Sequence, residues 1–359
     1  MQPTTLSPLD YPRQRWFWLV ALAAMVAAVY LGLLDRINDT SHLGMSGLFF
    51  LGAASLIWDD RHKLTLETDR LSTLIGGGLV LLTLLYSHYL LGLDSNQFSA
   101  EIATKEFFIC RITPLVSLFG VTLMASGLQN LRQFWRPLAI VAAMGVPSVF
   151  FINISDISPI TARFSHFLML YGGIDAVLRD NIYIYLNLGP NAQGAVKVYE
   201  ACSGIEAMNY LFGLSLTCLI MFPLRSRKLM AITPIIALGM GFIINSFRVV
   251  LMAILTAIQN DTAFDYWHDG KGSLTFGMVA VLSLGGFYML MMEWDRYQFK
   301  QNKAKPGEFS DRSPQFQPLS DDYLIPPDLD VSVQDLELDP DLDLLPPSGE
   351  TPSLRSPDV

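Results

Sequence analysis

The chain has 359 residues, of which 51% are hydrophobic and only 16% are charged, and its mean hydropathy is +0.37. Soluble domains carry about a quarter charged residues, so this deficit indicates that much of the chain faces something other than water. Three cysteines are too few for a disulfide-based secreted scaffold, and a net charge of −9 provides no surplus of Lys and Arg for nucleic-acid binding.

The negative charge is concentrated near the C-terminus. Residues Pro306–Val359 hold 13 Asp or Glu, 2 Arg and 10 of the 20 prolines, a net charge of −11 that leaves +2 for the preceding 305 residues. Such a segment has too little apolar surface to offset the entropy of ordering it. We therefore predict a membrane domain over 16–296, a short cytoplasmic N-terminus (1–15) and a disordered, acidic, Pro-rich cytoplasmic tail (297–359). Alternating Leu and Asp in Asp335–Leu345 leave a docking role for the tail open.

The membrane domain contains eight apolar runs. A spanning helix needs about 20 mainly apolar residues to cross about 30 Å of hydrocarbon. The runs that reach or approach this length are Trp16–Leu34, Leu43–Trp58, Leu71–Leu93, Phe107–Leu128, Leu138–Ile154, Ile205–Phe222, Leu229–Ile258 and Ser273–Met292. The seventh is too long for one crossing and too short for two, so we predict one long helix there. The predicted fold class is an all-α polytopic membrane protein with about eight transmembrane helices.

The basic residues of the loops predict the orientation. The connections on the side of the N-terminus contain 14 Lys and Arg, whereas those on the opposite side contain 6. Because cytoplasmic loops are enriched in Lys and Arg, we assign the first set to the cytoplasm. The sequence thus predicts a multi-pass protein of the cell (inner) membrane with both termini cytoplasmic.

The longest connection on the outer side is an insertion over residues 155–204. Apolar residues at helical spacing in Thr161–Val177 predict a helix at the membrane interface. Residues Asn181–Leu188 alternate apolar and polar side chains, a Gly- and Pro-containing turn follows, and Ala195–Tyr199 is a second candidate strand. This pattern predicts a small extracytoplasmic β-hairpin.

Counting residues along these elements brings three chemically active side chains to the outer membrane boundary. Cys202 follows the predicted hairpin and precedes the sixth apolar run. Because about 20 helical residues cross the hydrocarbon, a helix that starts inside at Leu229 reaches the outer boundary at Arg248. His268 lies just ahead of the eighth run, at the same boundary. Counting fixes only the depth of each residue, not whether the three helices are neighbours.

Each of these residues also has an ordinary structural interpretation. Cys202 is consistent with a small buried residue, like Cys110 and Cys218, but it precedes a helix N-terminus, whose dipole favours a thiolate. Arg248 is consistent with a cation that anchors a helix end, yet it lies within an apolar run, where a charge is costly and marks a functional candidate. His268 is consistent with an interfacial histidine.

Other polar residues complicate the choice. His88 and His166 also lie on or near the outer side and compete with His268 for a functional role. Arg111 is a second arginine within an apolar run, where pairing with an Asp or Glu of a neighbouring helix is expected. The sequence has neither His-x-x-x-His nor Cys-x-x-Cys spacing and lacks a phosphate-binding glycine loop, so we expect no metal and no cofactor.

Three short motifs together resemble the exosortase/archaeosortase family of polytopic membrane transpeptidases. They are Glu200-Ala-Cys-Ser-Gly-Ile205, Asn245-Ser-Phe-Arg248 and Trp267-His268, and the resemblance extends over roughly Phe107–Met292. The family implies a cysteine protease or transpeptidase that processes exported proteins at a C-terminal sorting signal: a Pro-Glu-Pro-like motif, a transmembrane helix and a basic end. The long acidic tail departs from the compact family pattern.

The resemblance also implies roles for individual residues. Cys202, Arg248 and His268 occupy the family's catalytic positions. We expect Cys202 to attack a substrate carbonyl through a thioester, Arg248 to stabilise the oxyanion and His268 to move the proton. Asn245 is expected to orient Arg248 or the substrate, and Glu200 to pair with Arg248 or His268.

Ser203, next to the cysteine, completes the set of supporting residues, and the expected partners are the lipid bilayer and exported proteins, not nucleic acid. Two alternative functions stay open: a non-enzymatic transporter or assembly scaffold, and an intramembrane hydrolase that cleaves without transfer. Transporters place polar groups near the midplane on broken helices, for which the candidates here are Pro114, Pro147 and Pro234.

Overall fold

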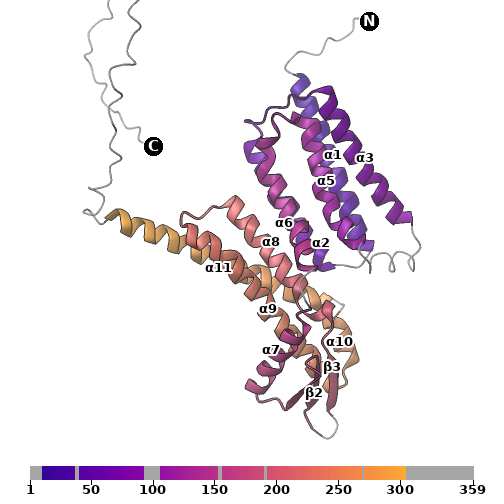
Figure 1. Cartoon of the computed structure of the whole chain (residues 1–359), viewed down its shortest axis with the longest axis vertical. Helices are drawn as coiled ribbons and strands as arrows, with labels where there is room; N and C mark the ends of the chain where they lie inside the picture. Colours follow the sequence, from indigo (N-terminus) through magenta and orange to yellow (C-terminus); the bar gives the residue numbers. More distant parts are fainter. Residues whose placement is uncertain are drawn as a thin grey trace, which may run out of the picture. The chain divides into compact units, whose positions relative to one another are not determined.

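The structure is a computed structural model that describes residues 10–36, 40–92, 106–152, 156–189, 192–268 and 271–304. This part of the chain is mostly helical and carries one small antiparallel sheet (Figure 1). The apolar helices are α1 (Asp10–Arg36), α2 (Thr40–Asp60), α3 (Arg70–Gly92), α5 (Glu106–Ser126), α6 (Trp135–Ile152), α8 (Ile205–Met221), α9 (Arg227–Ala257) and α11 (Lys271–Ala304). The predicted tail beyond Ala304 lies outside the described residues.

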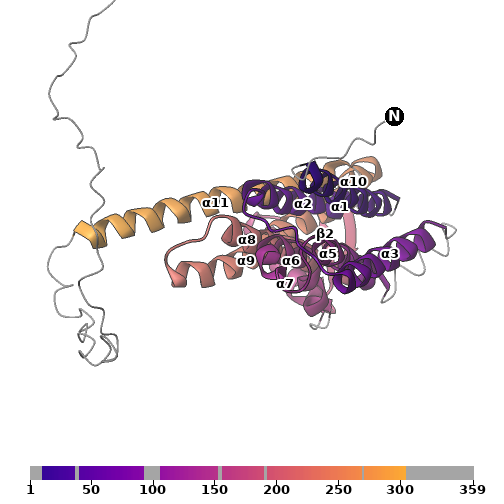
Figure 2. The ribbon, with the colours of Figure 1, turned by 90° about the horizontal axis from the view of Figure 1, so that it is seen from above.

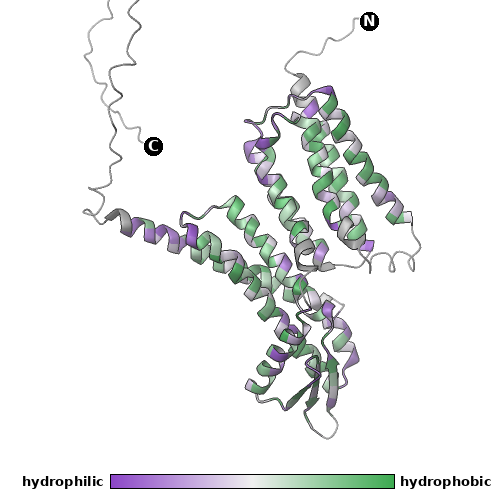
Figure 3. Cartoon of the chain, viewed as in Figure 1, coloured by the Kyte–Doolittle hydropathy of each residue, from purple (hydrophilic) through white to green (hydrophobic). Residues whose placement is uncertain are grey.

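Each of the eight predicted apolar runs coincides with one of these helices, and the seventh is a single helix, α9, as predicted. Four of the described helices, α1, α3, α9 and α11, are long and apolar enough to cross a membrane. Two shorter apolar helices are Cys110–Ser126, which is part of α5, and α8 itself. Figure 3 shows hydrophobic residues along much of the length of these helices. The chain is therefore a multi-pass membrane protein, whereas the number of eight spans stays a prediction.

Helix α11 differs from its predicted extent. The eighth run was expected to end at Met292 and the disordered tail to begin at residue 297, but the helix continues to Ala304. The physical reason is composition: residues 293–304 contain Glu, Arg, Gln, Lys and Ala, which favour helix, and neither Gly nor Pro. The polar end of α11 is visible in Figure 3.

Close helix packing begins from small residues. α3 lies beside α5 (Figure 2), where Gly76 and Gly120 bring the two backbones together; a Cβ on Gly120 would lie 2.7 Å from the carbonyl oxygen of Gly76. A core of buried side chains joins α1, α2, α6 and α8, including Tyr30, Phe49 and Ile140. These contacts pack the N-terminal helices against α8, the helix that follows Cys202.

The insertion between α6 and α8 consists of helix α7 (Ser158–Tyr171) and the strands β1 (Ala176–Arg179), β2 (Tyr183–Asn187) and β3 (Gln193–Lys197) in the order β1-β2-β3. The predicted hairpin is confirmed as β2 paired with β3, with Tyr183 opposite Lys197 and Asn187 opposite Gln193. The predicted helix over Thr161–Val177 is too long. It stops at Tyr171 because two glycines follow, Gly173 with a φ of +76°, and residues Ala176–Arg179 pair with β2 instead.

The insertion packs against the C-terminal half of α9. Buried side chains from α7, the sheet and α9 form one cluster that includes Met169, Ile184, Leu186, Val249 and Ala253. A short helix, α10 (Asp261–His268), contacts α9 directly after that helix ends. This part of α9 therefore contacts both the hairpin and α10.

Candidate active site

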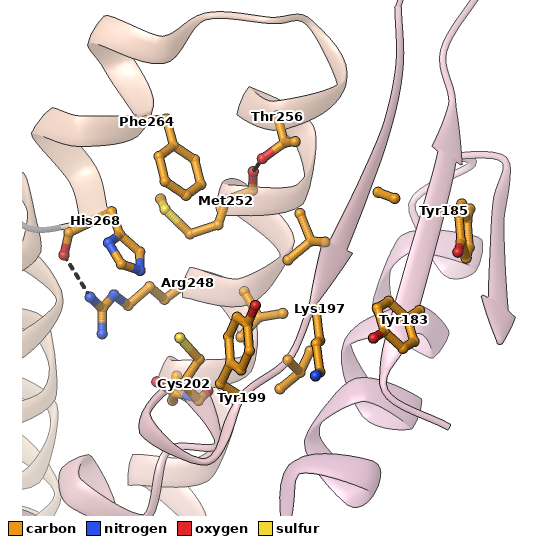
Figure 4. Close-up of a pocket in the computed structure, with 15 residues that line it drawn as sticks. Tyr183, Tyr185, Lys197, Tyr199, Cys202, Arg248, Met252, Thr256, Phe264 and His268 are labelled. Atoms are coloured by element: carbon orange, nitrogen blue, oxygen red, sulfur yellow. Dashed lines mark hydrogen bonds between the residues drawn. The ribbon is translucent and has the colours of Figure 1, made fainter. Parts of the chain in front are cut away.

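The sheet, α9 and α10 enclose a cavity of about 650 Å³. Four of the residues singled out from the sequence, Cys202, Asn245, Arg248 and His268, line this cavity (Figure 4). They come from three segments that are far apart in the sequence. The structure thus places a thiol, a guanidinium and an imidazole at one site.

The backbone after β3 places Cys202. A single 3₁₀ turn, η2 (Glu200–Cys202), forms with the amide of Cys202 donating to the carbonyl of Tyr199 at 2.9 Å. The hydroxyl of Ser203 then donates to the carbonyl of Glu200 at 2.6 Å. Gly204 follows with a φ of +94°, a left-handed conformation that favours glycine, and α8 begins at the next residue. Cys202 therefore lies at the entrance to α8, partly buried.

Asn245 of α9 secures this turn. Its side-chain amide donates to the carbonyl of Cys202 at 2.9 Å. A Cβ on Gly204 would lie 2.7 Å from the same amide nitrogen, so only glycine allows Asn245 to approach this closely. From the other side, the hydroxyl of Thr161 in α7 donates to the carbonyl of Ser203 at 2.6 Å. The carbonyls of Cys202 and Ser203 are thus held by two helices, α9 and α7.

Arg248 lies one turn after Asn245 on the same helix. Its Nη2 donates to the carbonyl of His268 at 2.8 Å, which joins α9 to the end of α10. Its Nε is buried and, among the described residues, has no hydrogen-bond partner. An unpaired buried donor costs free energy, so a ligand oxygen that bound this N–H would remove that cost.

His268 is the last residue of α10. Its imidazole stacks on the ring of Phe264, with centroids 5.1 Å apart and planes at 13°. Figure 4 shows the ring on the cavity side of α10, on the same side of the cavity as Arg248 and Cys202. Of its predicted competitors, His166 has its Nε2 2.9 Å from the carbonyl oxygen of Ala176, and neither it nor His88 lines the cavity.

The contacts of two supporting residues bear on their expected roles. Asn245, which was expected to orient Arg248 or the substrate, donates a hydrogen bond to the Cys202 carbonyl, and its role toward a substrate stays a prediction. The side chain of Glu200 is exposed and does not line the cavity, and the described residues include no ion pair between it and Arg248 or His268. In a 3₁₀ turn, neighbouring side chains point in different directions, so Glu200 faces away from Cys202.

The second arginine within an apolar run, Arg111, has the acidic partner that was expected for it. Nη2 of Arg111 in α5 lies 2.7 Å from Oε1 of Glu206, in the first turn of α8. The hydroxyl of Tyr210 donates to the same oxygen at 2.7 Å. The prediction that Arg111 pairs with an acid of a neighbouring helix is therefore confirmed. Sequence reasoning did not identify Glu206 as this partner, because a partner on another helix depends on how the helices pack.

Sequence reasoning missed the aromatic and basic lining from the hairpin. Tyr183, Tyr185, Lys197 and Tyr199 line the side of the cavity opposite α10. The ammonium of Lys197 lies 5.5 Å from the ring centroid of Tyr183 and 4.9 Å from that of Tyr199. The period-2 alternation with Ile184 and Leu186 was the available signal, because it places the tyrosines on one face of the strand.

The fold and the site define the class to which this chain belongs: a multi-pass helical membrane protein in which a cysteine shares a cavity with arginine and histidine. The family model for transmembrane exosortases (Exosortase_EpsH) matches residues 39–285, more than half of the chain. The chain therefore belongs to the transmembrane exosortase family, which confirms the resemblance. No curated protein matches it, and no solved structure does either.

Proposed function

We propose that this protein is a membrane-embedded cysteine protease and transpeptidase that cleaves the C-terminal sorting signals of exported proteins. The observation that carries the proposal is the cavity shared by Cys202, Arg248 and His268. Family membership supports the reaction class and the kind of substrate. The same residues on separate surfaces would not support covalent catalysis.

Cys202 is the nucleophile. Its position just before α8 places the thiol near a helix N-terminus, and the guanidinium of Arg248 lies in the same cavity. Both features favour the thiolate, which is the attacking form of cysteine. The sulfur attacks the carbonyl carbon of the scissile peptide bond, and the S–C bond forms as the C=O π electrons move to the oxygen. Collapse of this tetrahedral intermediate re-forms the carbonyl and breaks the C–N bond, which leaves a thioester.

Arg248 stabilises the oxyanion of the tetrahedral intermediate. One donor of its guanidinium is used by the carbonyl of His268, and the buried Nε has no hydrogen-bond partner among the described residues. A developing negative oxygen would supply that partner at the moment when charge appears. Donors of this kind contribute about 10²–10³-fold to kcat.

His268 transfers the proton. The imidazole receives the proton of the Cys202 thiol and delivers it to the leaving amine, so the cleaved fragment departs neutral. Stacking on Phe264 fixes the ring, and the bond from Arg248 fixes the backbone of the same residue. The acyl group on sulfur then passes to an amine acceptor, or to water, with the histidine acting as base.

The lining of the cavity supports a short acidic, Pro-containing recognition sequence. Aromatic rings from β2 and the segment after β3 form apolar surfaces of the kind that bind proline residues. The cations Lys197 and Arg248 line the cavity, and its described lining contains no Asp or Glu. A Pro-Glu-Pro-like motif provides two prolines for the rings and one carboxylate for a cation. The basic inner loops support a cavity that faces the extracytoplasmic side.

The decisive experiment uses a reporter protein that ends in a Pro-Glu-Pro motif, an apolar helix and basic residues, expressed together with the full chain. We expect Cys202→Ala to reduce the appearance of the shortened reporter by about 10⁴-fold or more, because the nucleophile is removed. Cys218→Ala, which removes a thiol outside the cavity, is the matched control and should retain processing. Processing that persists in Cys202→Ala would refute the thiol mechanism.

Trapping separates transfer from simple hydrolysis. Acid quenching of the wild-type reaction should yield the reporter fragment linked to Cys202 by a thioester, and this adduct should be absent in Cys202→Ala. If the fragment carries an added acceptor, transpeptidation is the reaction. A fragment with a free carboxylate alone indicates an intramembrane hydrolase, and the absence of both fragment and adduct would contradict the proposed enzyme.

A further inference from the structure

A second cavity, of about 480 Å³, lies beside the candidate active site on the other side of Arg248. Its walls come from α2, α8, α9 and α11, and we call it the outer groove. Asn245 and Arg248 line both the outer groove and the active-site cavity. A ligand that occupies the outer groove therefore reaches the same two residues that hold Cys202 and His268 in place.

The polar and apolar residues of the outer groove are segregated. Its polar lining comes from the first turns of α8 and α11 and from α9 next to the cysteine turn: Glu206, Tyr210, Asn245, Arg248 and Ser273. The rest of the lining is mainly aliphatic and extends along α11 to Leu282. From Ser273 to Leu282, α11 rises about 14 Å, which is roughly half of the hydrocarbon thickness. The outer groove thus matches a ligand with a polar end at the membrane boundary and an apolar body within the bilayer.

Two glycines leave room for a close approach of another backbone. A Cβ added to Gly44 of α2 or to Gly277 of α11 would meet no atom within 4 Å, in contrast to Gly76 and Gly120, which are filled by neighbouring helices. Helices associate in membranes through such small residues, because they allow backbones to pack closely. Gly44 and Gly277 therefore form the kind of surface on which a transmembrane helix packs.

The side-chain hydrogen bonds that join α11 to the segment Cys218–Ser226 lie deeper than the outer groove. The hydroxyl of Tyr288 donates to the carbonyls of Cys218 and Phe222, and the carboxylate of Asp295 accepts from the amides of Arg225 and Ser226 at 2.7 and 3.1 Å. These bonds fix the inner half of α11. The outer half can therefore contact a ligand without breaking them.

We infer that the outer groove binds the apolar helix of the sorting-signal substrate and so delivers the motif that precedes this helix to Cys202. The inference rests on the proposed function. Its first basis is that the outer groove is continuous with the active-site cavity through Asn245 and Arg248. Its second basis is that the groove is polar at one end and apolar along its length, as a sorting signal is with its motif and its helix. A lipid chain is the competing occupant, and the test below distinguishes the two.

Photo-crosslinking tests where the substrate helix lies. A benzophenone amino acid replaces Met278 in a Cys202→Ala chain, which retains uncleaved reporter, and Val279 serves as the matched control. Both positions are exposed, by 63% and 46%, and they have the same depth on α11, but only Met278 lines the outer groove. We expect the reporter to crosslink from position 278 and not from position 279. Crosslinks to lipid alone, or equal reporter yields, would refute the inference.

A substitution supplies an independent readout. Gly277→Leu fills the outer groove, and we expect about tenfold slower processing of the helix-bearing reporter. Gly286→Leu is the control, because this glycine also has open space but lies outside the groove lining. The ratio of processing with the helix-bearing reporter to that with a helix-free motif peptide should fall only for Gly277→Leu. An unchanged ratio would refute the inference that the outer groove binds the substrate helix. Processing activity in Cys202→Ala would instead refute the proposed function.

Discussion

At the scale of single residues, the site depends on two polar side chains one turn apart on α9. Asn245 binds the carbonyl of Cys202, and Arg248 binds the carbonyl of His268. One helix therefore holds the backbone at both of the proposed reacting groups. Because both bonds go to main-chain oxygens, Asn245 and Arg248 position the backbone that carries the thiol and the imidazole.

Arg248→Lys tests whether the arginine acts through its shape or only through its charge. A lysine retains the charge, but its ammonium lacks the planar fork of donors by which a guanidinium can bind the His268 carbonyl and an oxyanion at the same time. We expect kcat to fall about 10²–10³-fold with a smaller change in KM. Arg163→Lys on α7, outside the cavity, is the control. Near-normal kcat in Arg248→Lys would show that charge alone suffices.

The residue scale also shows how far sequence reasoning extends. Counting along helices predicted the depth of Cys202, Arg248 and His268, because each helical residue adds a fixed rise. It did not predict their partners. Glu200 and Glu206 lie close together in sequence, but only Glu206, on a helix packed near α5, meets an arginine. The direction of a side chain and the neighbours of a helix depend on how the helices pack. Counting residues along the sequence gives only depth and carries no information about packing.

At the scale of elements, strong periodic signals were sufficient for prediction and short ones were not. Long apolar runs marked all eight apolar helices, and alternation with turn residues marked β2 and β3. The strand β1 was missed because its four residues are too few to show a period. These residues adopt a strand conformation because they pair with β2. The extension of α11 was missed because polar helix formers resemble a solvated tail.

The N-terminus of α3 provides a pH-dependent test of one element. A carboxylate oxygen of Asp69 accepts from the amide of Ser72 at 3.0 Å, and hydrogen bonds from Ser72 lower the pKa of Asp69 below its usual 3.8. The cap therefore stabilises α3 fully above about pH 4, and this contribution is lost as the pH falls through the lowered pKa.

We expect Asp69→Ala to lower the thermal unfolding temperature in detergent at pH 7, and this deficit to shrink as the pH is reduced below 4. Glu67→Ala, an exposed carboxylate in the same loop, is the control and should leave the temperature nearly unchanged. The measurement is tryptophan fluorescence during heating. An Asp69→Ala deficit that stayed constant as the pH fell would show that the ionised carboxylate is not the stabilising group.

At the scale of the whole molecule, the proposed function requires that α8 cross the membrane. The cysteine turn lies at its start, and the basic loop that precedes α9 lies at its end. α8 has only 17 residues, a rise of about 26 Å, which is slightly less than the hydrocarbon thickness. The loop from Phe222 to Ser226, fixed by Asp295, would then lie at the inner membrane surface. The predicted orientation follows only if this short helix is a complete span.

Labelling with a membrane-impermeant maleimide tests that requirement in a chain without native cysteines. Gln193→Cys, at the start of β3, should react in intact cells, because the loop charges predict that the sheet faces outward. Lys228→Cys, in the first turn of α9, should react only after the membrane is opened. Both positions are exposed, so access decides the result. Labelling of both from outside would mean that α8 does not cross, and the reverse pattern would place the cavity in the cytoplasm, where exported substrates could not reach it.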